Sequence, residues 1–216
     1  MMLLRHNADN DYQIIFSMKK ILYFVAAMGL LVACGNNKPA AEIDGVVNDS
    51  TTTDTIVPDE RGYIVKVGDI APDFEAVVAG TGERVSLGEY RGKRVVMLQF
   101  TASWCGVCRK EMPEIERQIW QRHKDNQHFA LLGIDRDEPD STVLAFAEKT
   151  GVTYPLVLDP GGEIFQQYAH RLAGITRNVI VDTDGRIVML TRLYDEDEFN
   201  SMVAVIDSLL AEVAQK

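Results

Sequence analysis

The stretch 99–115 reads QFTASWCGVCRKEMPEI and holds two of the chain's three cysteines, Cys105 and Cys108. The residues before it, 94–100 (RVVMLQF), form a continuous apolar run that is typical of a buried strand. The residues after the first cysteine, 105–124, show the apolar spacing of a helix with one buried face. The stretch therefore predicts a strand that passes directly into a helix, with the cysteine pair at the junction.

A cysteine at the start of a helix is favoured in its ionised form. The first N–H groups of a helix lack partners within the helix, and the helix dipole places partial positive charge there. Both effects lower the pKa of the Cys105 thiol and make it a nucleophile. Cys108 follows within one turn, close enough to attack a mixed disulfide formed on Cys105. This spacing suits a pair that cycles between dithiol and disulfide, although two cysteines could also be half of a metal site.

The rest of the apolar pattern predicts an α/β fold. Strands are expected at 75–79, 84–87, 128–135 and 154–159, and a hairpin around Asp184-Gly185 within 178–193. Helices are expected at 140–151, 163–170 and 195–216, with a short helix or turn at 86–93. Strands joined through helices pair in parallel, whereas hairpins pair antiparallel. We therefore expect a mixed central sheet flanked by helices, with an N-terminal β-hairpin extension.

The first 33 residues are expected to lie outside this fold. Met18 and two lysines precede an apolar run over 21–33, which is too short to span a bilayer and typical of a signal-peptide core. Cys34 ends the sequence LVAC, which resembles a bacterial lipobox, so we expect Cys34 to carry lipid. The alternative is an ordinary signal peptide cut near Ala33. Residues 1–17 precede a complete signal sequence, which suggests that Met18 is the true start.

Residues 34–62 are polar and rich in Thr, Asp and Asn, and we interpret them as a flexible tether to a domain over 63–216. If Cys34 carries lipid, only Cys105 and Cys108 remain, and an exported domain with one close pair suggests that the pair is used in chemistry. The formal net charge of −10, without a basic cluster on a helix face, argues against nucleic acid as a partner.

Three segments carry a family resemblance: VGDIAPDF at 67–74, FTASWCGVCRKEMPEI at 100–115 and IVDTDGRI at 180–187. They resemble the TlpA/ResA-like branch of the thioredoxin superfamily, which is in turn similar to the AhpC/TSA family. The resemblance implies a thioredoxin-like fold from about Val67 to the C-terminus. It also implies an exported, membrane-tethered thiol–disulfide oxidoreductase that reduces disulfides of other exported proteins. We expect this protein to lie in the cell envelope and to face the periplasm. Cys105 would attack, Cys108 would resolve, a membrane or periplasmic thiol reductant would restore the pair, and no cofactor would be needed.

The resemblance also assigns supporting residues around the pair. Pro113 matches a proline that kinks the active-site helix, and Glu111 matches an acid that could take the proton of Cys108. The alternative for Glu111 is a solvated surface carboxylate. Trp104 is expected to form a hydrophobic contact surface beside the cysteines, or else to pack in the core. Gln99 stands where thioredoxin has a buried aspartate, and an amide cannot act as a base.

The largest departure from the family lies in the loop that faces the cysteines. The family has a cis-proline six residues before the aspartate of the hairpin, and this position is Thr176 here. A cis bond to a non-proline residue costs about 2.5–4 kcal/mol, so we expect Ile175–Thr176 to be trans. Arg177 follows, and we expect its cation beside the thiolate, where it would lower the pKa of Cys105 further. The alternative is a surface arginine on a loop.

Two other functions remain open from the residues alone. A peroxidase would use Cys105 to attack peroxide, although Ala102 stands where peroxiredoxins have threonine. A non-enzymatic module would bind a partner chain or a metal through the altered loop, but the histidines show no paired spacing and no metal site is predicted. Asp135, Asp137 and Glu138, after the strand at 128–135, are interpreted as a solvated loop and helix cap.

Overall fold

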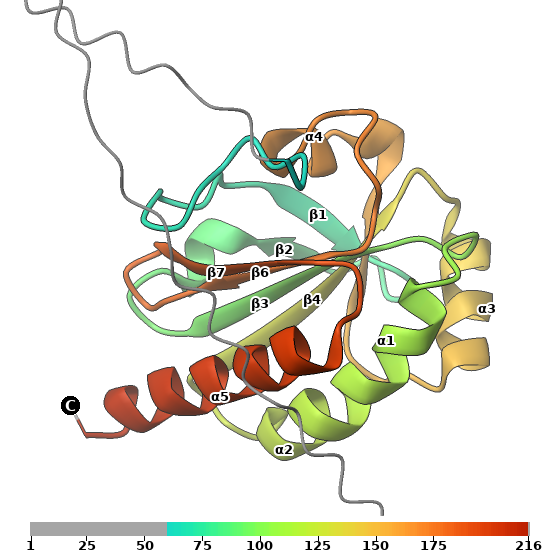
Figure 1. Ribbon diagram of the computed structural model, residues 1–216. Coiled ribbons are helices and arrows are strands. Elements are labelled where there is room, and N and C mark those ends of the chain that lie inside the picture. The colour runs from blue at the N-terminus through green and yellow to red at the C-terminus, as the bar shows by residue number, and fades with distance from the viewer. Residues whose placement is uncertain (1–59, 216) are drawn as a thin grey trace, which may run out of the picture. The chain divides into compact units, whose positions relative to one another are not determined.

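The computed structural model of the chain describes residues 60–215 (Figure 1). The predicted signal peptide, the start at Met18, the lipidated Cys34 and all but the end of the tether lie outside the described residues. Among the helices of residues 60–215, none combines the length and apolar character that crossing a membrane would need.

Seven strands form one mixed sheet in the order β2-β1-β5-β4-β3-β6-β7. β3, β4 and β5 run parallel, whereas β1, β2, β6 and β7 each pair antiparallel with their neighbours. The strands span Glu75–Val78 (β1), Arg84–Ser86 (β2), Val95–Thr101 (β3), Phe129–Arg136 (β4), Leu156–Asp159 (β5), Arg177–Val181 (β6) and Ile187–Arg192 (β7). The sheet confirms the predicted mixed architecture, its N-terminal hairpin and the hairpin around Gly185.

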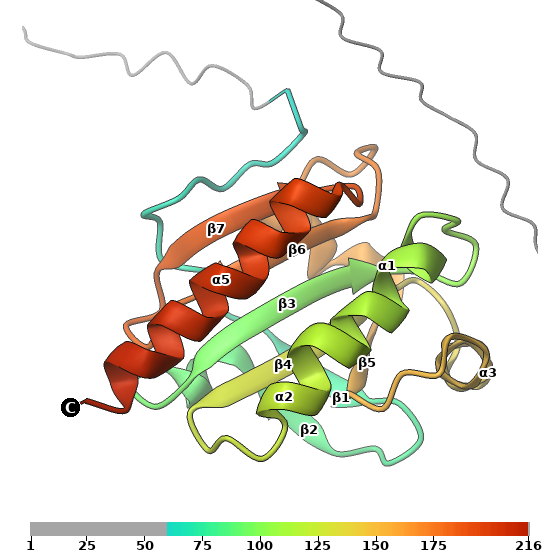
Figure 2. The same ribbon diagram turned by 60° about the horizontal axis from the view of Figure 1, so that its bottom comes forward.

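Helices cover both faces of this sheet (Figures 1 and 2). α1, α2 and α5 lie on one face and α4 on the other, where the α4 rings of Phe165 and Tyr168 contact Phe100 of β3. Every residue of β3 and β6 is buried, so these two central strands form the middle of the core. The α-helices span Cys108–Ile115 (α1), Gln121–His123 (α2), Asp140–Thr150 (α3), Phe165–Tyr168 (α4) and Glu196–Val213 (α5).

The predicted helix over 105–124 is wrong in its start and in its continuity. It begins at Cys108, and before it the Cys105 N–H bonds back to the Ala102 carbonyl in a turn. Beyond Pro113, which lacks the N–H that a helix interior uses, α1 gives way to a π-helical segment over Glu116–Trp120 before α2. Short 3-10 turns occur at Leu87–Tyr90 and Pro160–Gly162.

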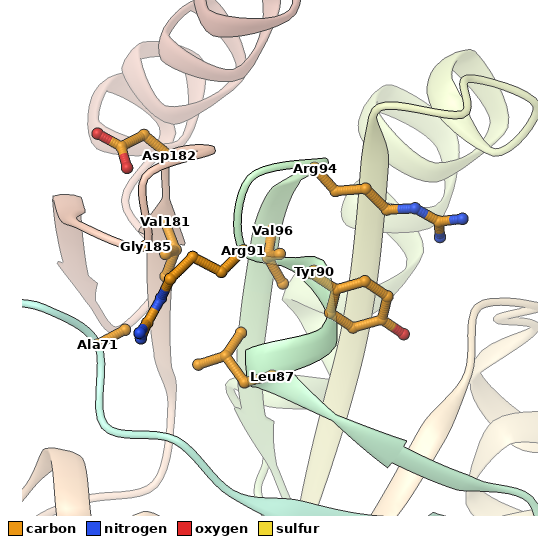
Figure 3. A pocket seen from close by; sticks show the side chains of 9 residues that line it. All are labelled: Ala71, Leu87, Tyr90, Arg91, Arg94, Val96, Val181, Asp182 and Gly185. Atoms are coloured by element: carbon orange, nitrogen blue, oxygen red, sulfur yellow. The ribbon is translucent and has the colours of Figure 1, made fainter.

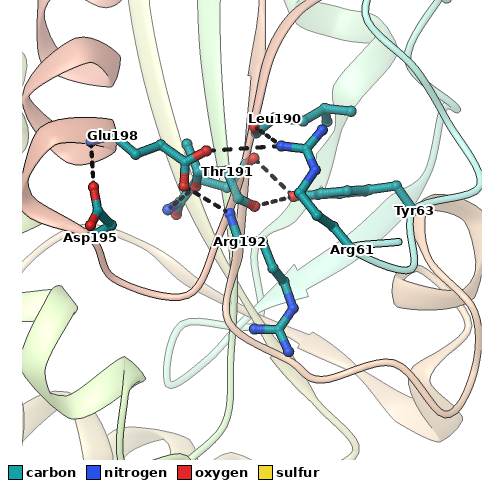
Figure 4. A network of polar contacts seen from close by, with 8 residues as sticks. Arg61, Tyr63, Leu190, Thr191, Arg192, Asp195 and Glu198 are labelled. Atoms are coloured by element: carbon teal, nitrogen blue, oxygen red, sulfur yellow. Dashed lines mark hydrogen bonds and ion pairs between the residues drawn. The ribbon is translucent and has the colours of Figure 1, made fainter. Parts of the chain in front are cut away.

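Residues at the start of the described chain make hydrogen bonds with β7 and an ion pair with α5 (Figure 4). The Tyr63 hydroxyl donates to the Thr191 carbonyl at 2.5 Å, and Arg61 Nη1 donates to the Leu190 carbonyl at 2.9 Å. Arg61 also lies 3.9 Å from the carboxylate of Glu198, which accepts from the Arg192 N–H. Among the described residues, Arg61 and Tyr63 thus contact the domain, and Arg61 lies before the predicted boundary at 63.

Candidate active site

Cys105 and Cys108 lie where β3 passes into α1 and are joined by a disulfide, with their Cα atoms 5.3 Å apart. The two cysteines differ in exposure: the Cys105 residue is 7% exposed and Cys108 is fully buried. A thiolate of another molecule can therefore reach Cys105 more readily than Cys108. This asymmetry fits the predicted division between an attacking and a resolving cysteine.

Hydrogen bonds around the disulfide favour negative charge on Cys105. The Cys108 N–H, at the start of α1, donates to the Cys105 sulfur at 3.1 Å. The Thr176 hydroxyl lies 3.1 Å from the same sulfur and 3.3 Å from that of Cys108. Donors aimed at a sulfur stabilise its ionised form.

The loop that carries Cys105 is held by a carboxylate from another element. Glu138, after β4, accepts from the Ser103 N–H at 2.5 Å and from the Ser103 hydroxyl at 2.6 Å. Arg109 Nη1 donates to the Ser103 carbonyl at 2.6 Å. Trp104, next in the chain, is 61% exposed, so it does not pack in the core.

The structure places Thr176 opposite the cysteines, as the family resemblance implies for the residue six positions before Asp182. The described residues contain no cis peptide bond, so Ile175–Thr176 is trans as expected. Thr176 is almost completely buried, and its carbonyl accepts from the Leu193 N–H at 3.2 Å.

The expectation that Arg177 lies beside the thiolate is wrong. Consecutive residues of a strand point to opposite faces of the sheet, so Arg177 points away from the face that Thr176 shares with α1. Its guanidinium lies 4.4 Å from the centre of the Tyr63 ring and donates to the carbonyls of Gly174 and Arg61. Arg177 is fully buried, so the alternative of a surface arginine is also wrong.

Glu111 is not the solvated carboxylate of the alternative interpretation. It lies on α1 one turn after Cys108 and is 1% exposed. Its Oε1 accepts from Asn178 Nδ2 at 2.7 Å, whereas Oε2 has no hydrogen-bond partner within residues 60–215. Burial raises the pKa of Glu111 from 4.5 to about 7, against the effect of the Asn178 hydrogen bond.

Glu111 belongs to a buried polar cluster that the sequence analysis missed in part. Asn178 Nδ2 also donates to Thr191 Oγ1, and the Tyr154 hydroxyl donates to Gln99 Oε1 at 2.7 Å. Strand alternation could have pointed to Asn178, because it lies two residues after Thr176 and faces the same side. Gln99, which accepts the bond from Tyr154, is fully buried.

The interpretation of Asp135 as part of a solvated loop is wrong. Asp135 is fully buried in β4, directly across from Thr101 of β3. Burial, followed by the nearby Glu138 carboxylate, raises the pKa of Asp135 from 3.8 to about 8. The strand continues to Arg136, so the acidic residues at the end of this run belong partly to the core.

A small cavity lies away from this site. The cavity in Figure 3 has a volume of about 10 Å³, room for roughly one water molecule. Leu87, Val96 and Val181 line it at the amino end of β3, whereas the cysteines follow the carboxyl end. Among residues 60–215, no three side chains of the His, Cys, Asp or Glu type are grouped so that they could hold a metal ion.

Comparison with known proteins agrees with this geometry. Residues 66–207 match the Redoxin family, and the chain belongs to this family. The thiol-disulfide oxidoreductase ResA of Bacillus thuringiensis subsp. konkukian is 29% identical over 133 residues, which cover 59% of this chain and 73% of that protein.

Two solved structures are similar along most of their own length. A candidate protein disulfide isomerase from Bacteroides thetaiotaomicron is 64% identical, with a TM-score of 0.67 over 69% of this chain and 93% of that chain. A candidate thiol:disulfide interchange protein DsbE from Chlorobium tepidum is 25% identical, with a TM-score of 0.59 over 68% and 99%. The fold is thus thioredoxin-like, and the chain is a TlpA/ResA-like thiol–disulfide oxidoreductase with a Cys105–Cys108 redox pair.

Proposed function

We propose that this oxidoreductase is a lipid-anchored enzyme of the cell envelope, facing the periplasm, that reduces disulfides in exported proteins. The observation that carries the dithiol cycle is Glu111. A reductase must deprotonate the buried Cys108 so that it can resolve the mixed disulfide. A buried carboxylate one turn away, with its pKa raised to about 7, suits a base that accepts this proton near neutral pH.

The reaction follows from the two sulfurs. The Cys105 thiolate attacks one sulfur of a substrate disulfide, so that a bond to Cys105 forms, the substrate S–S bond breaks, and the other substrate sulfur leaves as a thiolate that takes a proton from water. Cys108 then gives its proton to Glu111 and attacks Cys105. The Cys105–Cys108 bond forms as the bond to the substrate breaks, and two electrons have passed to the substrate.

The anchoring and the partners are proposed from the sequence together with the accessible Cys105. The apolar run at 21–33 and the LVAC sequence ending at Cys34 support export and lipidation. Because Cys105 is the more accessible sulfur, the same position serves the substrate disulfide and a separate membrane or periplasmic thiol donor that restores the dithiol.

A redox titration tests the direction. The full-length protein with Cys34→Ser is equilibrated with dithiothreitol or glutathione buffers, and the Cys105–Cys108 state is measured by thiol trapping and tryptophan fluorescence. We expect a reversible two-electron couple near −270 mV, the value of a thioredoxin-like reductant. A couple near −120 mV would indicate an oxidant, and the absence of a reversible disulfide would overturn the dithiol cycle.

Two further assays separate the alternatives. Peroxide consumption by the reduced protein, compared with Cys108→Ser, should be negligible; rapid consumption that survives the substitution would favour a peroxidase. Radiolabelled palmitate should be incorporated by the native chain and not by Cys34→Ala. Equal labelling of the two chains, or labelling of neither, would refute the lipid anchor.

A further inference from the structure

The Thr176 hydroxyl lies between the two sulfurs of the redox pair. Its Oγ1 atom is 3.1 Å from the sulfur of Cys105 and 3.3 Å from that of Cys108. A sulfur in a disulfide carries no hydrogen, so the hydroxyl is the donor in both contacts. From one position, this side chain can therefore donate to either sulfur.

The position of the hydroxyl is fixed by the sheet. Thr176 is 2% exposed and immediately precedes β6, which pairs with β3 on one side and β7 on the other. The Leu193 N–H holds its carbonyl at 3.2 Å. Moving the hydrogen bond from one sulfur to the other therefore requires rotation of the O–H bond and no movement of the main chain.

The two sulfurs depend on this hydroxyl to different degrees. The Cys105 sulfur also accepts from the Cys108 N–H. Within residues 60–215, Thr176 is the one hydrogen-bond partner of the Cys108 sulfur. Because Cys108 is fully buried, water does not reach it readily as a substitute, and a buried charge without a donor is costly.

Charged groups surround the pair without contacting the hydroxyl. Glu111 lies on α1 beyond Cys108, and Arg109 on the same helix bonds to the Ser103 carbonyl. Glu138 holds the loop before Cys105, and Arg177 points to the other face of the sheet. Replacement of the Thr176 hydroxyl therefore alters the donor to the sulfurs and leaves each of these charges in place.

We propose that Thr176 is a catalytic residue of the exchange reaction, whose hydroxyl donates to Cys105 while that sulfur is the attacking thiolate and to Cys108 when the negative charge passes there. This inference rests on the dithiol cycle of the proposed function. In the first step the hydroxyl stabilises the Cys105 thiolate. Once the mixed disulfide forms, the Cys105 sulfur is neutral and the hydroxyl turns to the Cys108 thiolate, which then displaces the substrate sulfur. The threonine is neither oxidised nor deprotonated.

The expected effect follows from the strength of a hydrogen bond to a charged group, which is about twice that of a neutral one. Without the hydroxyl, the thiolate fraction below neutral pH should fall about tenfold. A more basic thiolate is also more nucleophilic, with a Brønsted slope of about 0.45, so the attack rate should fall only about threefold to fourfold. The pH–rate profile should move about one pH unit toward alkaline values.

The reaction with 5,5′-dithiobis(2-nitrobenzoate) tests both steps in one trace. Attack by Cys105 on this disulfide releases one coloured thiolate, and attack by Cys108 on the mixed disulfide releases the second. Stopped-flow absorbance of the reduced full-length protein with Cys34→Ser therefore gives two phases. The variants are Thr176→Val, which keeps the shape and removes the hydroxyl, and Thr176→Ser, which keeps the hydroxyl. Thermal unfolding of each oxidised protein checks the fold.

We expect both phases of Thr176→Val to slow by about threefold or more, with shifted pH profiles, and both phases of Thr176→Ser to stay within about twofold of the parent. Unchanged rates in Thr176→Val, or equal loss in the serine variant, would overturn the role of the hydroxyl. A loss confined to the first phase would overturn the transfer to Cys108. If the parent protein releases one coloured thiolate rather than two, the dithiol cycle fails, which is a different result from any of these.

Discussion

Glu111→Gln should make the stability of the oxidised protein less dependent on pH. The pKa of Glu111 rises from 4.5 to about 7 on folding, because its carboxyl group is buried on α1. The folded state therefore binds this proton more tightly than the unfolded state. The stability that comes from the protonated group is complete below about pH 4.5 and is lost as the pH rises through 7.

The size of the effect can be worked from this shift. Between pH 5 and pH 8, ionisation of Glu111 should cost the folded protein about 2.5 kcal/mol. Glutamine cannot ionise, and its side-chain oxygen can still accept the hydrogen bond from Asn178 Nδ2. The difference in unfolding free energy between the variant and the parent should therefore change by about 2.5 kcal/mol over this range, in favour of the variant at pH 8.

Urea denaturation of both oxidised proteins at pH 5, 6, 7 and 8 measures this difference. Keeping the disulfide formed removes cysteine ionisation from the comparison. Asp135 also gives the parent a pH-dependent stability, but it is unchanged in the variant and cancels in the difference. Parallel stability curves for the two proteins would refute the assignment of Glu111 as a buried group that titrates near neutral pH, and with it the proton acceptor for Cys108.

Three other variants test the surroundings of the site. Asp135→Asn should also make the stability less dependent on pH. Because the pKa of Asp135 is raised to about 8, the unfolding free energy of the parent should fall by about 1.4 kcal/mol per pH unit between pH 5 and 7. If the carboxyl were solvated, the same urea series would show no change in this slope. Glu138→Gln weakens the hydrogen bonds to Ser103, so the Ser103 amide should exchange with solvent at least about tenfold faster by NMR. An unchanged exchange rate would contradict the role of Glu138 in holding this loop. Arg177→Met should lower stability by about 2–4 kcal/mol through loss of its hydrogen bonds and ring contacts. The pH dependence of Cys105 alkylation should stay the same in this variant, and a shift would restore the idea that the cation acts on the thiolate.

Much of the fold could be predicted because local patterns and tertiary packing agree in the central strands. β3 follows the apolar run at 94–100 almost residue for residue, and the Asp184-Gly185 turn lies between β6 and β7. The predicted start of the helix after Cys105 is three residues too early, since the chain first makes a turn, with a backbone bond from Cys105 to Ala102, that apolar spacing does not reveal. Helix boundaries depend on such single bonds, whereas strand positions are supported by every residue of a run.

The site was predictable where a motif or the family resemblance places a residue. The cysteine pair follows from its separation, and Thr176 follows from the resemblance, which puts the residue six positions before Asp182 opposite the pair. Asp135 was missed because acidic residues in a row are typical of a solvated loop, and the first of them is still part of β4. Its burial depends on the register with Thr101, which a single sequence does not give.

The first residues of β6 explain why neighbouring positions serve such different purposes. Because side chains alternate along a strand, Thr176 and Asn178 face α1, where one meets the two sulfurs and the other holds Glu111. Arg177, between them, faces the opposite side and packs on Tyr63, at the start of the described domain. A shift of one residue in this strand would exchange the two sets, bringing a cation to the thiolate and removing the hydroxyl and the amide together. The register of β6 against β3 therefore determines both which side chains reach the redox pair and which side chain packs on the N-terminal segment.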